Sequence, residues 1–316
     1  MREERSPGTT DLSDIFKRDF TLVIPAFNEF PVLPDLVTEL RATFSKYHLS
    51  GEIIFVDDGS TDHTAELALE LTADWDAVKV LRHRSNLGKT ESILTAFKES
   101  TRRNMIIFDA DLQHSPEEIP RFLVELQRGS DIVTGKKVGD YQKPFVSKIY
   151  NWLSKRIFKV PVSDLNSMKA FKTEILSGIH LRHDWHRFFV VLAYHKGYSV
   201  SEIPIELFPR IAGESKYSSP LRIIPAIIDM MSVWFLIIFS RKPLILFGFT
   251  GIILILSGLL VAALAFYFRF ALDTGFRPLL YLVMLLETVG FLMLGFGLVA
   301  EMIAQVREEF HQSRQE

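Results

Sequence analysis

Two aspartates separated by one residue follow a short apolar run, and together they could hold one divalent cation. They are Asp109 and Asp111, and the run before them is residues 105–108. Residues i and i+2 of a strand lie on the same face, and hard oxygen ligands favour Mg²⁺ or Mn²⁺, which bind carboxylates together with substrate phosphates. The pattern predicts a metal that carries a diphosphate. The alternative is a solvated Asp-rich turn that caps the helix beginning near Ser115.

Three apolar segments upstream are predicted strands, and polar residues follow each of them. The segments and their tips are 20–25 with Ala26-Phe27-Asn28-Glu29, 52–56 with Asp57-Asp58-Gly59-Ser60, and 78–81 with Asn86-Leu87-Gly88-Lys89. Helical stretches such as 90–100 alternate with them, which indicates an α/β fold with a doubly wound, mostly parallel sheet. Ligands of such sheets bind beyond the carboxyl ends of the strands. The polar tips should therefore converge on one site.

The four motifs, in this order and spacing, resemble glycosyltransferase family 2. Later segments, at 131–135, 160–164, 169–171 and 209–217, resemble its polyprenyl-phosphate, dolichyl-phosphate mannosyltransferase-like branch. The resemblance implies a GT-A fold over residues 19–218. It also implies inverting transfer of a single hexose, mannose or glucose, from a nucleotide-diphosphate sugar to dolichyl or undecaprenyl phosphate.

The resemblance also assigns binding residues. The implied nucleotide-sugar site consists of Pro25, Ala26, Phe27, Glu29, Val56, Asp57, Lys89, Asp109, Ala110 and Lys137. The implied ligands for Mg²⁺ or Mn²⁺ are Asp109, Asp111 and Gln113. Two alternatives stay open: Phe27 as a packed core ring and Lys89 as a solvated lysine. Asp58, Asp62 and His63 are predicted to be turn and cap residues.

The implied catalytic residues are Asp111, Asp164, Arg210 and Lys216. Arg210 and Lys216 belong to a Gly-containing segment, which in the resemblance closes over the donor diphosphate and the acceptor phosphate; a basic surface loop near anionic lipid is the alternative. Lys137 stands where the branch usually carries arginine, and lysine keeps the charge without the bidentate fork. Asp164 would either accept a proton or orient a basic side chain.

The predicted chemistry needs no general base. A phosphate monoester has a second pKa of about 6, so the acceptor oxygen is already largely anionic at neutral pH. The metal would neutralise charge on the departing diphosphate.

Other functions compete with this one. A processive synthase normally carries Gln-x-x-Arg-Trp, whereas this chain has Asp184-Trp185-His186-Arg187-Phe188. Transfer to another lipid, such as a glycerolipid or ceramide, and an inactive nucleotide-sugar-binding scaffold are the remaining alternatives.

The composition fits a protein that is partly soluble and partly apolar. The chain has 316 residues, 48% hydrophobic, with a net charge of -2 and no Cys. Disulfides, thiolate catalysis and zinc-thiolate sites are excluded, and nothing in the charge or motifs indicates nucleic acid. Residues 1–18 are predicted to be a disordered tail without the apolar run of a signal peptide.

Two segments, 243–268 and 278–303, are long enough to span a membrane, which takes roughly 20 apolar residues. The predicted connection contains Arg269, Asp273, Gly275 and Arg277, and residues 305–316 form a tail. Residues 219–242 are predicted to form an interfacial helix, with a third span as the alternative. The catalytic domain and both termini are placed in the cytoplasm, because nucleotide sugars are made there. Glu287, within the second span, would contact a neighbouring helix or subunit of a homo-oligomer, or border the lipid-phosphate path.

Overall fold

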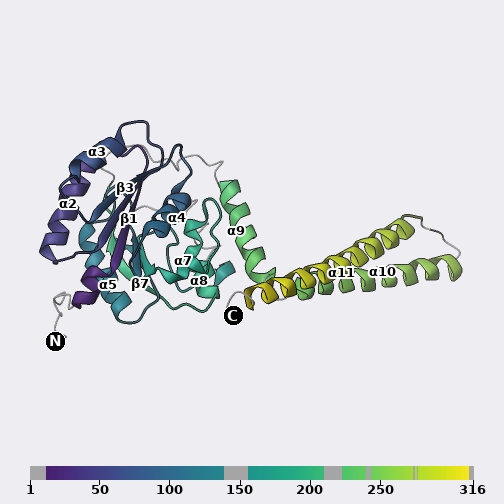
Figure 1. The fold of residues 1–316 in the computed structure, drawn as a ribbon. Helices are drawn as coiled ribbons and strands as arrows, with labels where there is room; N and C mark the ends of the chain where they lie inside the picture. The colour runs from purple at the N-terminus through teal and green to yellow at the C-terminus, as the bar shows by residue number, and fades with distance from the viewer. Residues whose placement is uncertain are drawn as a thin grey trace, which may run out of the picture. The chain divides into compact units, whose positions relative to one another are not determined.

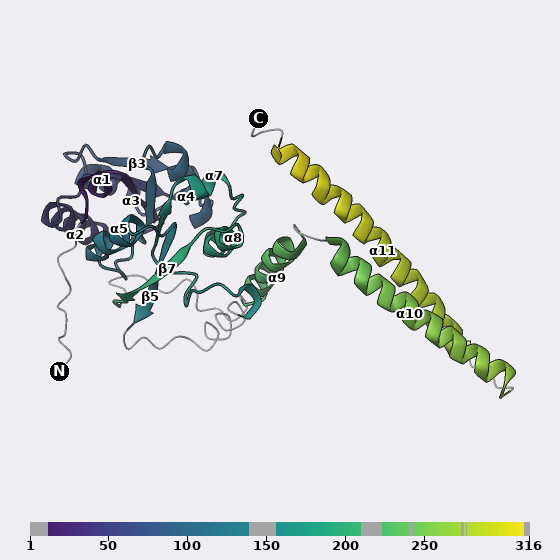
Figure 2. The same cartoon turned by 90° about the horizontal axis from the view of Figure 1, so that it is seen from below.

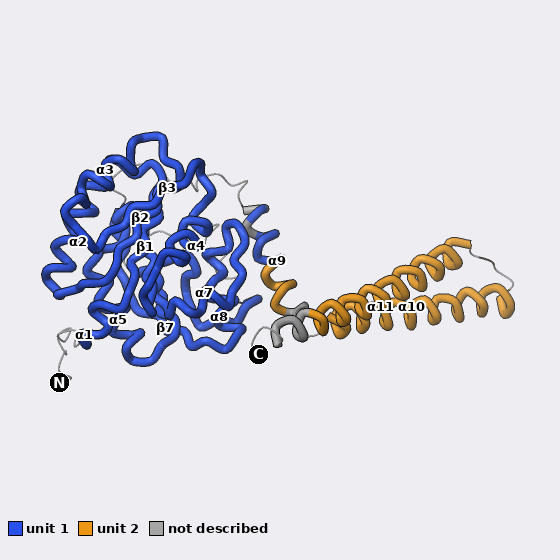
Figure 3. The backbone as a smooth tube through the Cα atoms, viewed as in Figure 1, with its two compact units in different colours: residues 1–230 blue, residues 231–316 orange. Residues whose placement is uncertain are grey.

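The computed structural model describes residues 12–138, 156–209, 223–239, 243–272, 275 and 277–312. The chain divides into two compact units, residues 1–230 and 231–316 (Figure 3). The first unit contains the polar strand tips, and the second contains the long apolar segments.

The first unit is built on a seven-stranded sheet in the order β3-β2-β1-β4-β6-β5-β7. The strands are β1 Phe20–Ala26, β2 Glu52–Asp57, β3 Val78–Arg82, β4 Asn104–Ile107, β5 Ile132–Val138, β6 Lys169–Lys172 and β7 Val200–Glu206. Strand β6 runs antiparallel to both of its neighbours, and the other pairs are parallel. The predicted mostly parallel α/β sheet is confirmed.

Helices surround this sheet (Figures 1 and 2). They are α1 Asp14–Arg18, α2 Leu33–Lys46, α3 Thr64–Leu71, α4 Lys89–Glu99, α5 Ile119–Gln127, α7 Glu174–Ser177 and α8 Phe189–His195, with 3₁₀ turns η1 Pro116–Glu118 and η2 Trp185–Arg187. The Ser115 side chain caps η1 by accepting a hydrogen bond from the Glu117 backbone N at 3.2 Å.

Helix α1 corrects the prediction of a disordered tail over residues 1–18. Leu12 is buried, and the Ser13 backbone N donates to Gln127 Oε1 of α5 at 2.8 Å. These tertiary contacts, which no local pattern reveals, hold residues 14–18 in a helix. Residues 1–11 lie outside the described part of the chain.

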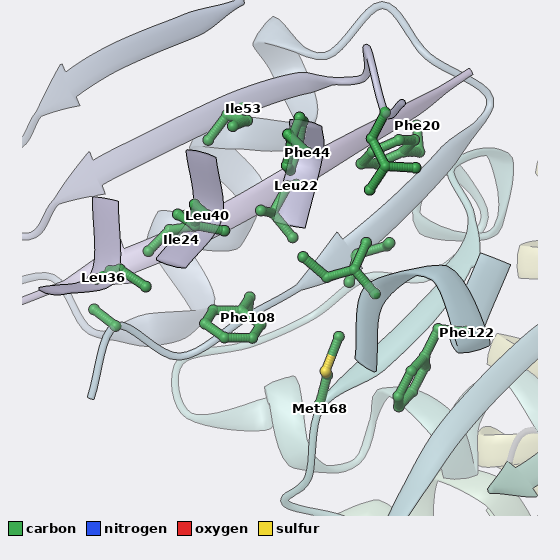
Figure 4. Packing of buried hydrophobic residues seen from close by; sticks show 14 of the residues in the cluster. Phe20, Leu22, Ile24, Leu36, Leu40, Phe44, Ile53, Phe108, Phe122 and Met168 are labelled. Carbon is green, nitrogen blue, oxygen red and sulfur yellow. The ribbon is translucent and has the colours of Figure 1, made fainter. Parts of the chain in front are cut away.

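The core forms where β1 meets α2 (Figure 4). Strand β1 is buried almost throughout, as expected of a central parallel strand covered on both faces. Helix α2 presents Leu36, Leu40 and Phe44 at a spacing of four residues, which places them in one stripe. The rings of Phe20 and Phe44 lie 5.9 Å apart. This packing fixes the strand whose carboxyl end carries the first polar tip.

The second unit contains a hairpin of two long helices, α10 Pro243–Phe270 and α11 Arg277–Gln312. Their backbones approach closely at Gly251 and Gly290. A Cβ added at Gly251 would lie only 2.7 Å from the carbonyl oxygen of Gly290. Small residues permit this approach in membrane helices. Within 243–270 and 277–306, an 18-residue window of each helix has a mean hydropathy of 2.7 and 2.2, respectively, and both helices are long and apolar enough to cross a membrane. Few residues of either apolar stretch are buried, so these are not the core helices of a soluble domain.

Helix boundaries in this unit differ from the predicted ones. Arg269 belongs to the last turn of α10 and Arg277 is the first residue of α11, so neither lies in the connection. Helix α11 also continues to Gln312 through the predicted tail, because helix propagation is favourable once started and no Gly or Pro interrupts residues 298–312. Asp273 lies outside the described residues.

Helix α9, Ile223–Phe239, crosses the boundary between the two units. Pro225 stands in its first turn, where proline is tolerated because the first backbone N–H groups have no partner within the helix. The helix has 17 residues, and its apolar part, Ile227–Ile237, is shorter than the stretches in the hairpin that could span a membrane. Its interfacial location stays a prediction.

Candidate active site

The carboxyl ends of β1, β2 and β4 meet at one edge of the sheet. Pro25 is paired with Val56 and Ala26 with Asp57, and these are the last two pairs of β1 and β2. Strand β4 follows in register beside β1, and the Phe108 backbone N donates to Val23 O at 2.9 Å. The sequence motifs therefore converge as predicted.

Asp57 is buried and held by a turn of its own chain. Its two carboxylate oxygens lie 3.2 and 3.3 Å from the backbone N of Ser60. The Nε of Arg82, the last residue of β3, lies 3.4 Å from Asp57 Oδ2. The sequence reasoning missed Arg82, although its place at the tip of the neighbouring strand was a usable signal. Asp57, which the resemblance implies in nucleoside binding, is therefore ion-paired with the Arg82 guanidinium.

Asp58 braces the segment that leads into α4. Its oxygens accept hydrogen bonds from the backbone N of Leu87 at 2.9 Å and of Gly88 at 2.8 Å, and His83 Nδ1 lies 2.8 Å away. Gly88 has φ of +92°, a conformation that favours glycine. The structure thus places Asp58 in the predicted turn role.

The loop after β1 is tied to the loop after β2. Asn28 adopts a left-handed conformation, its backbone N donates to Ser60 Oγ at 2.9 Å, and its Oδ1 accepts from the Thr61 backbone N at 2.9 Å. The Glu29 backbone N donates to Thr64 Oγ1 at 3.0 Å. Phe27, on this loop, is only partly buried and is not part of the main hydrophobic core cluster, which disfavours the packed-ring alternative.

Asp62 stabilises the turn that leads into α3. Its Oδ1 accepts from the backbone N of Thr64 at 3.2 Å, and its Oδ2 accepts from the backbone N of Phe30 at 3.2 Å. Burial opposes ionisation, but the hydrogen bonds from Thr64 and Phe30 outweigh it and lower the pKa of Asp62. Asp62 therefore has the predicted turn role, whereas the N-cap position of α3 is His63, which makes no side-chain cap hydrogen bond.

Lys89 and Asp109 form an ion pair across the site. The lysine ammonium contacts Asp109 Oδ1, with 27% of the lysine and 38% of the aspartate side chain exposed. Burial works against the charged carboxylate, but Lys89 holds the pKa of Asp109 well below its usual range. Because both groups reach solvent, water screens part of this attraction. The alternative of a merely solvated Lys89 is wrong.

The chain turns sharply after Asp109 and brings Asp111 and Gln113 together. Leu112 has φ of +51°, and the Gln113 backbone N donates to Asp111 Oδ1 at 3.2 Å. Ala110 is buried beneath this turn. Gln113 O accepts from the Phe208 backbone N at 2.9 Å, which anchors the turn to the segment after β7.

His114 follows this turn, and the sequence reasoning missed it. The side chain is buried, with Nδ1 3.3 Å from Glu206 O. Burial lowers the pKa of His114, and Asp109 opposes the shift. A buried neutral histidine here lines the turn rather than adding charge to it.

The turn fits a divalent metal that arrives with phosphates. Among the described residues, no cluster of three or more His, Asp or Glu side chains is placed to hold a metal alone. Asp109 and Asp111 supply hard carboxylate oxygens, and Mg²⁺ is commonly bound by one or two carboxylates plus substrate phosphates. The Lys89 ammonium on Asp109 shows that this carboxylate attracts a cation. The side-chain role of Gln113 stays a prediction.

Lys137 and Asp164 form a second pair of oppositely charged side chains. Lys137 Nζ is 3.6 Å from Asp164 Oδ2 and donates to Asn166 O at 3.0 Å. Two residues predicted separately are therefore brought together. Arg210 and Lys216 lie outside the described residues, so their place at the site stays a prediction.

Comparison with known proteins decides the family. The model of the family described as Glycosyl transferase family 2 matches residues 21–188, which is more than half of the chain. The chain belongs to this family. It is a glycosyltransferase.

Curated relatives are similar over nearly the whole chain. An undecaprenyl-phosphate 4-deoxy-4-formamido-L-arabinose transferase of Pseudomonas fluorescens is 30% identical over 90% of this chain and 85% of its own length. The transferase of the same name from Salmonella enteritidis is 28% identical over 90% of this chain and 88% of its own length.

Solved structures support the GT-A-like fold. Glucosyl-3-phosphoglycerate synthase of Mycobacterium tuberculosis superposes with a TM-score of 0.57 at 15% identity, over 72% of this chain and 85% of that one. Another structure of that synthase, with Mn²⁺, UDP-glucose and phosphoglyceric acid, has a TM-score of 0.56 at 14% identity, covering 73% and 86%. That synthase thus binds Mn²⁺ and a nucleotide sugar.

Proposed function

We propose that this glycosyltransferase moves one sugar from a nucleotide-diphosphate sugar to a polyprenyl phosphate at a membrane surface. The proposal rests on two features that occur in one chain. One is the turn that carries Asp109 and Asp111, with Lys89 ion-paired to Asp109, and the other is the apolar helical hairpin. The named activity of the curated relatives supports it. Their similarity covers 90% of the chain, more than the first unit of 230 residues, and therefore extends into the apolar helices.

The donor side is the edge formed by β1, β2 and β4. Asp109 and Asp111 would hold Mg²⁺ or Mn²⁺, which when bound supplies Lewis-acid neutralisation of the departing diphosphate. Lys89 would exchange its contact with Asp109 for a phosphate oxygen. Asp57 and the loop carrying Phe27 and Glu29 would contact the nucleoside, through hydrogen bonds and a stacking face.

The acceptor side is the Lys137-Asp164 pair. Lys137 would meet the acceptor phosphate as a point charge, and Asp164 would orient Lys137, as their separation of 3.6 Å supports. Arg210 and Lys216 would complete both phosphate contacts. The acceptor oxygen attacks as an anion, so no side chain has to remove a proton, and attack opposite the leaving group inverts the anomeric centre.

The hairpin would hold the enzyme at its lipid substrate. Two spans return the chain to its starting side, which places the catalytic unit and both termini together, and we propose the cytoplasmic side. Every backbone group in such helices is paired internally, as lipid requires. Helix α9 would lie at the interface.

The sugar itself is a finer question. The sequence resemblance implies a hexose, mannose or glucose, whereas the relatives are named for 4-deoxy-4-formamido-L-arabinose. No described contact selects among these sugars, so the donor panel below includes all three.

The test is a transfer assay with the detergent-purified full chain. GDP-mannose, UDP-glucose and UDP-4-deoxy-4-formamido-L-arabinose are each offered with undecaprenyl or dolichyl phosphate and Mn²⁺ or Mg²⁺, and glycolipid is followed by mass spectrometry. Product that requires lipid phosphate and metal, and that disappears in Asp111→Ala but persists in the surface control Asp74→Ala, supports the proposal. Nucleotide binding without product from any donor would refute it and favour another lipid acceptor or a binding scaffold.

A further inference from the structure

Lys169 lies in the sheet beneath the site and has no role in the function described so far. It is the first residue of β6, opposite Ile107 of β4 and Thr134 of β5. Only 4% of its surface is exposed. Lysine is almost never this buried unless it is paired.

The Lys169 ammonium is held by backbone carbonyls. Nζ donates to Leu165 O at 2.9 Å and, more weakly, to His186 O at 3.5 Å. Leu165 directly follows Asp164, so the shorter hydrogen bond fixes the segment that carries the acceptor-side aspartate. Among the described residues, no carboxylate forms an ion pair with Lys169 within 4.0 Å.

The longer hydrogen bond reaches toward the donor side. The His186 backbone N donates to Thr90 Oγ1 at 3.2 Å, and His186 Nδ1 lies 3.1 Å from the same hydroxyl. Thr90 directly follows Lys89. Lys169 therefore links the segments behind both charged pairs of the site, with its stronger contact on the Asp164 side.

Four charged groups act on Lys169 from the elements around it. They are Lys89 of α4, Lys137 of β5, Asp109 after β4 and Asp164. Burial, followed by Lys89, lowers the pKa of Lys169 to about 7, and the two aspartates oppose the shift. Burial also lowers the pKa of the neighbouring His186 well below its usual value, so that ring is neutral.

Packing does not explain a lysine at this position. A buried ammonium with two carbonyl partners costs folding free energy compared with an apolar side chain of similar volume. Such groups are more common at functional sites. The charge and its place therefore point to a role in the reaction.

We propose that Lys169 is a positioning residue for the acceptor side: its ammonium holds the Leu165 carbonyl, and thereby Asp164 and Lys137, in place for the acceptor phosphate. The inference rests on the proposed function. Loss of the Lys169 proton removes a positive charge beneath the phosphate and weakens the hydrogen bond to Leu165 O, because a neutral amine is a poorer donor than an ammonium.

With Lys169 in this role, kcat/KM for the acceptor should fall on both the acid and the alkaline side of its pH optimum. The acid limb comes from the acceptor phosphate, with its second pKa of about 6. The alkaline limb comes from Lys169 in the free enzyme, near pH 7. The two limbs have different origins, so a substitution can remove one and leave the other.

The test compares Lys169→Met with Lys172→Met. Lys172 lies on the same strand but pairs with Asp131 at 2.6 Å, away from the site. We expect Lys169→Met to lower kcat/KM for polyprenyl phosphate by about 10-fold, a size typical of residues that orient a site from behind. The donor KM should stay unchanged and the alkaline limb should disappear, whereas Lys172→Met should keep the wild-type profile.

Folding is checked separately by thermal unfolding without substrates. Between pH 7 and about 10.4 the unfolded chain binds more protons at Lys169 than the folded chain, so wild-type stability rises with pH across this window. Lys169→Met lacks this rise, and its Tm should exceed the wild-type Tm at pH 7, with the gap closing toward pH 10. Lys169→Gln is the second variant if the methionine does not fold.

The outcomes separate the two proposals. An alkaline limb that persists in folded Lys169→Met, or a loss confined to the donor KM, overturns the role of Lys169 while the proposed function stands. A wild-type enzyme that makes no polyprenyl-phosphate sugar overturns both.

Discussion

The carboxyl ends of β2 and β4 each carry two aspartates after a buried parallel strand, but the fold partners them differently. Asp58 accepts hydrogen bonds from the backbone N of Leu87 and Gly88, which hold a loop in place. Asp109 instead faces the ammonium of Lys89. A side chain can move when a ligand arrives, whereas a backbone donor cannot leave without unfolding its loop. Asp58 therefore holds a loop in place, and we propose that the end of β4 is the site at which one cation can replace another.

Asp109→Asn should have the largest effect on activity. The substitution keeps the size of the side chain but removes the charge that would hold the metal and its diphosphate. We expect turnover to fall by about 10³-fold, the scale for losing a group that stabilises developing charge. The measurement is glycolipid formation at saturating donor. Turnover close to wild type would show that the end of β4 is not the donor site.

Asp58→Ala should have the largest effect on stability. It leaves two partly buried backbone N–H groups and His83 without their carboxylate, and we expect a loss of about 3 kcal/mol of unfolding free energy. Asp62→Ala, which removes an exposed hydrogen bond from the Phe30 backbone N and a partly buried one from the Thr64 backbone N, should cost only about 1 kcal/mol. Denaturant unfolding of the two variants side by side gives the ranking. Equal losses would contradict the assignment of Asp58 as a brace.

Lys89→Met tests whether the carboxylate at the end of β4 can exchange the lysine ammonium for a metal ion. Without the competing ammonium, Asp109 should bind Mn²⁺ about 10-fold more tightly when no nucleotide is present. Nucleoside diphosphate should bind more weakly, because a phosphate partner is lost. Electron paramagnetic resonance of Mn²⁺ and calorimetry with UDP and GDP give the two affinities. Unchanged metal affinity would mean that Lys89 does not compete for this carboxylate.

Glu66→Ala should have the smallest effect. Glu66 pairs with Arg82 at 2.6 Å on the exposed side of the β2 tip, with about half of each side chain accessible. Exposed pairs contribute little, and Arg82 keeps its contact with Asp57. We expect no measurable change in Tm or in nucleotide affinity. A marked loss of nucleotide binding would show that Glu66 places Arg82 for the nucleoside.

Much of this architecture was predictable from local sequence. Buried parallel strands read as unbroken apolar runs, so β1, β2 and β4 and the edge at which they end could be located. The two helices of the hairpin were equally clear, because an uninterrupted apolar stretch of this length is typical of a helix that spans a membrane. The geometry of Asp109 and Asp111 was not predicted correctly: β4 ends at Ile107 and both aspartates lie in the segment that turns after it, so the expected alternation along a strand does not apply to them.

The sequence alone determined which residues stand at the sheet edge and which helices are apolar, since both depend on periodicity and length along the chain. Only the tertiary structure decided what each of those residues touches. Arg82 reaches Asp57 because β3 lies next to β2. Lys169 is buried because β6 runs antiparallel between β4 and β5, a pairing that no local pattern specifies. The burial and the partners of a residue come from segments distant in the chain. They distinguish Asp58, which holds a loop, from Asp109, which pairs with the Lys89 ammonium.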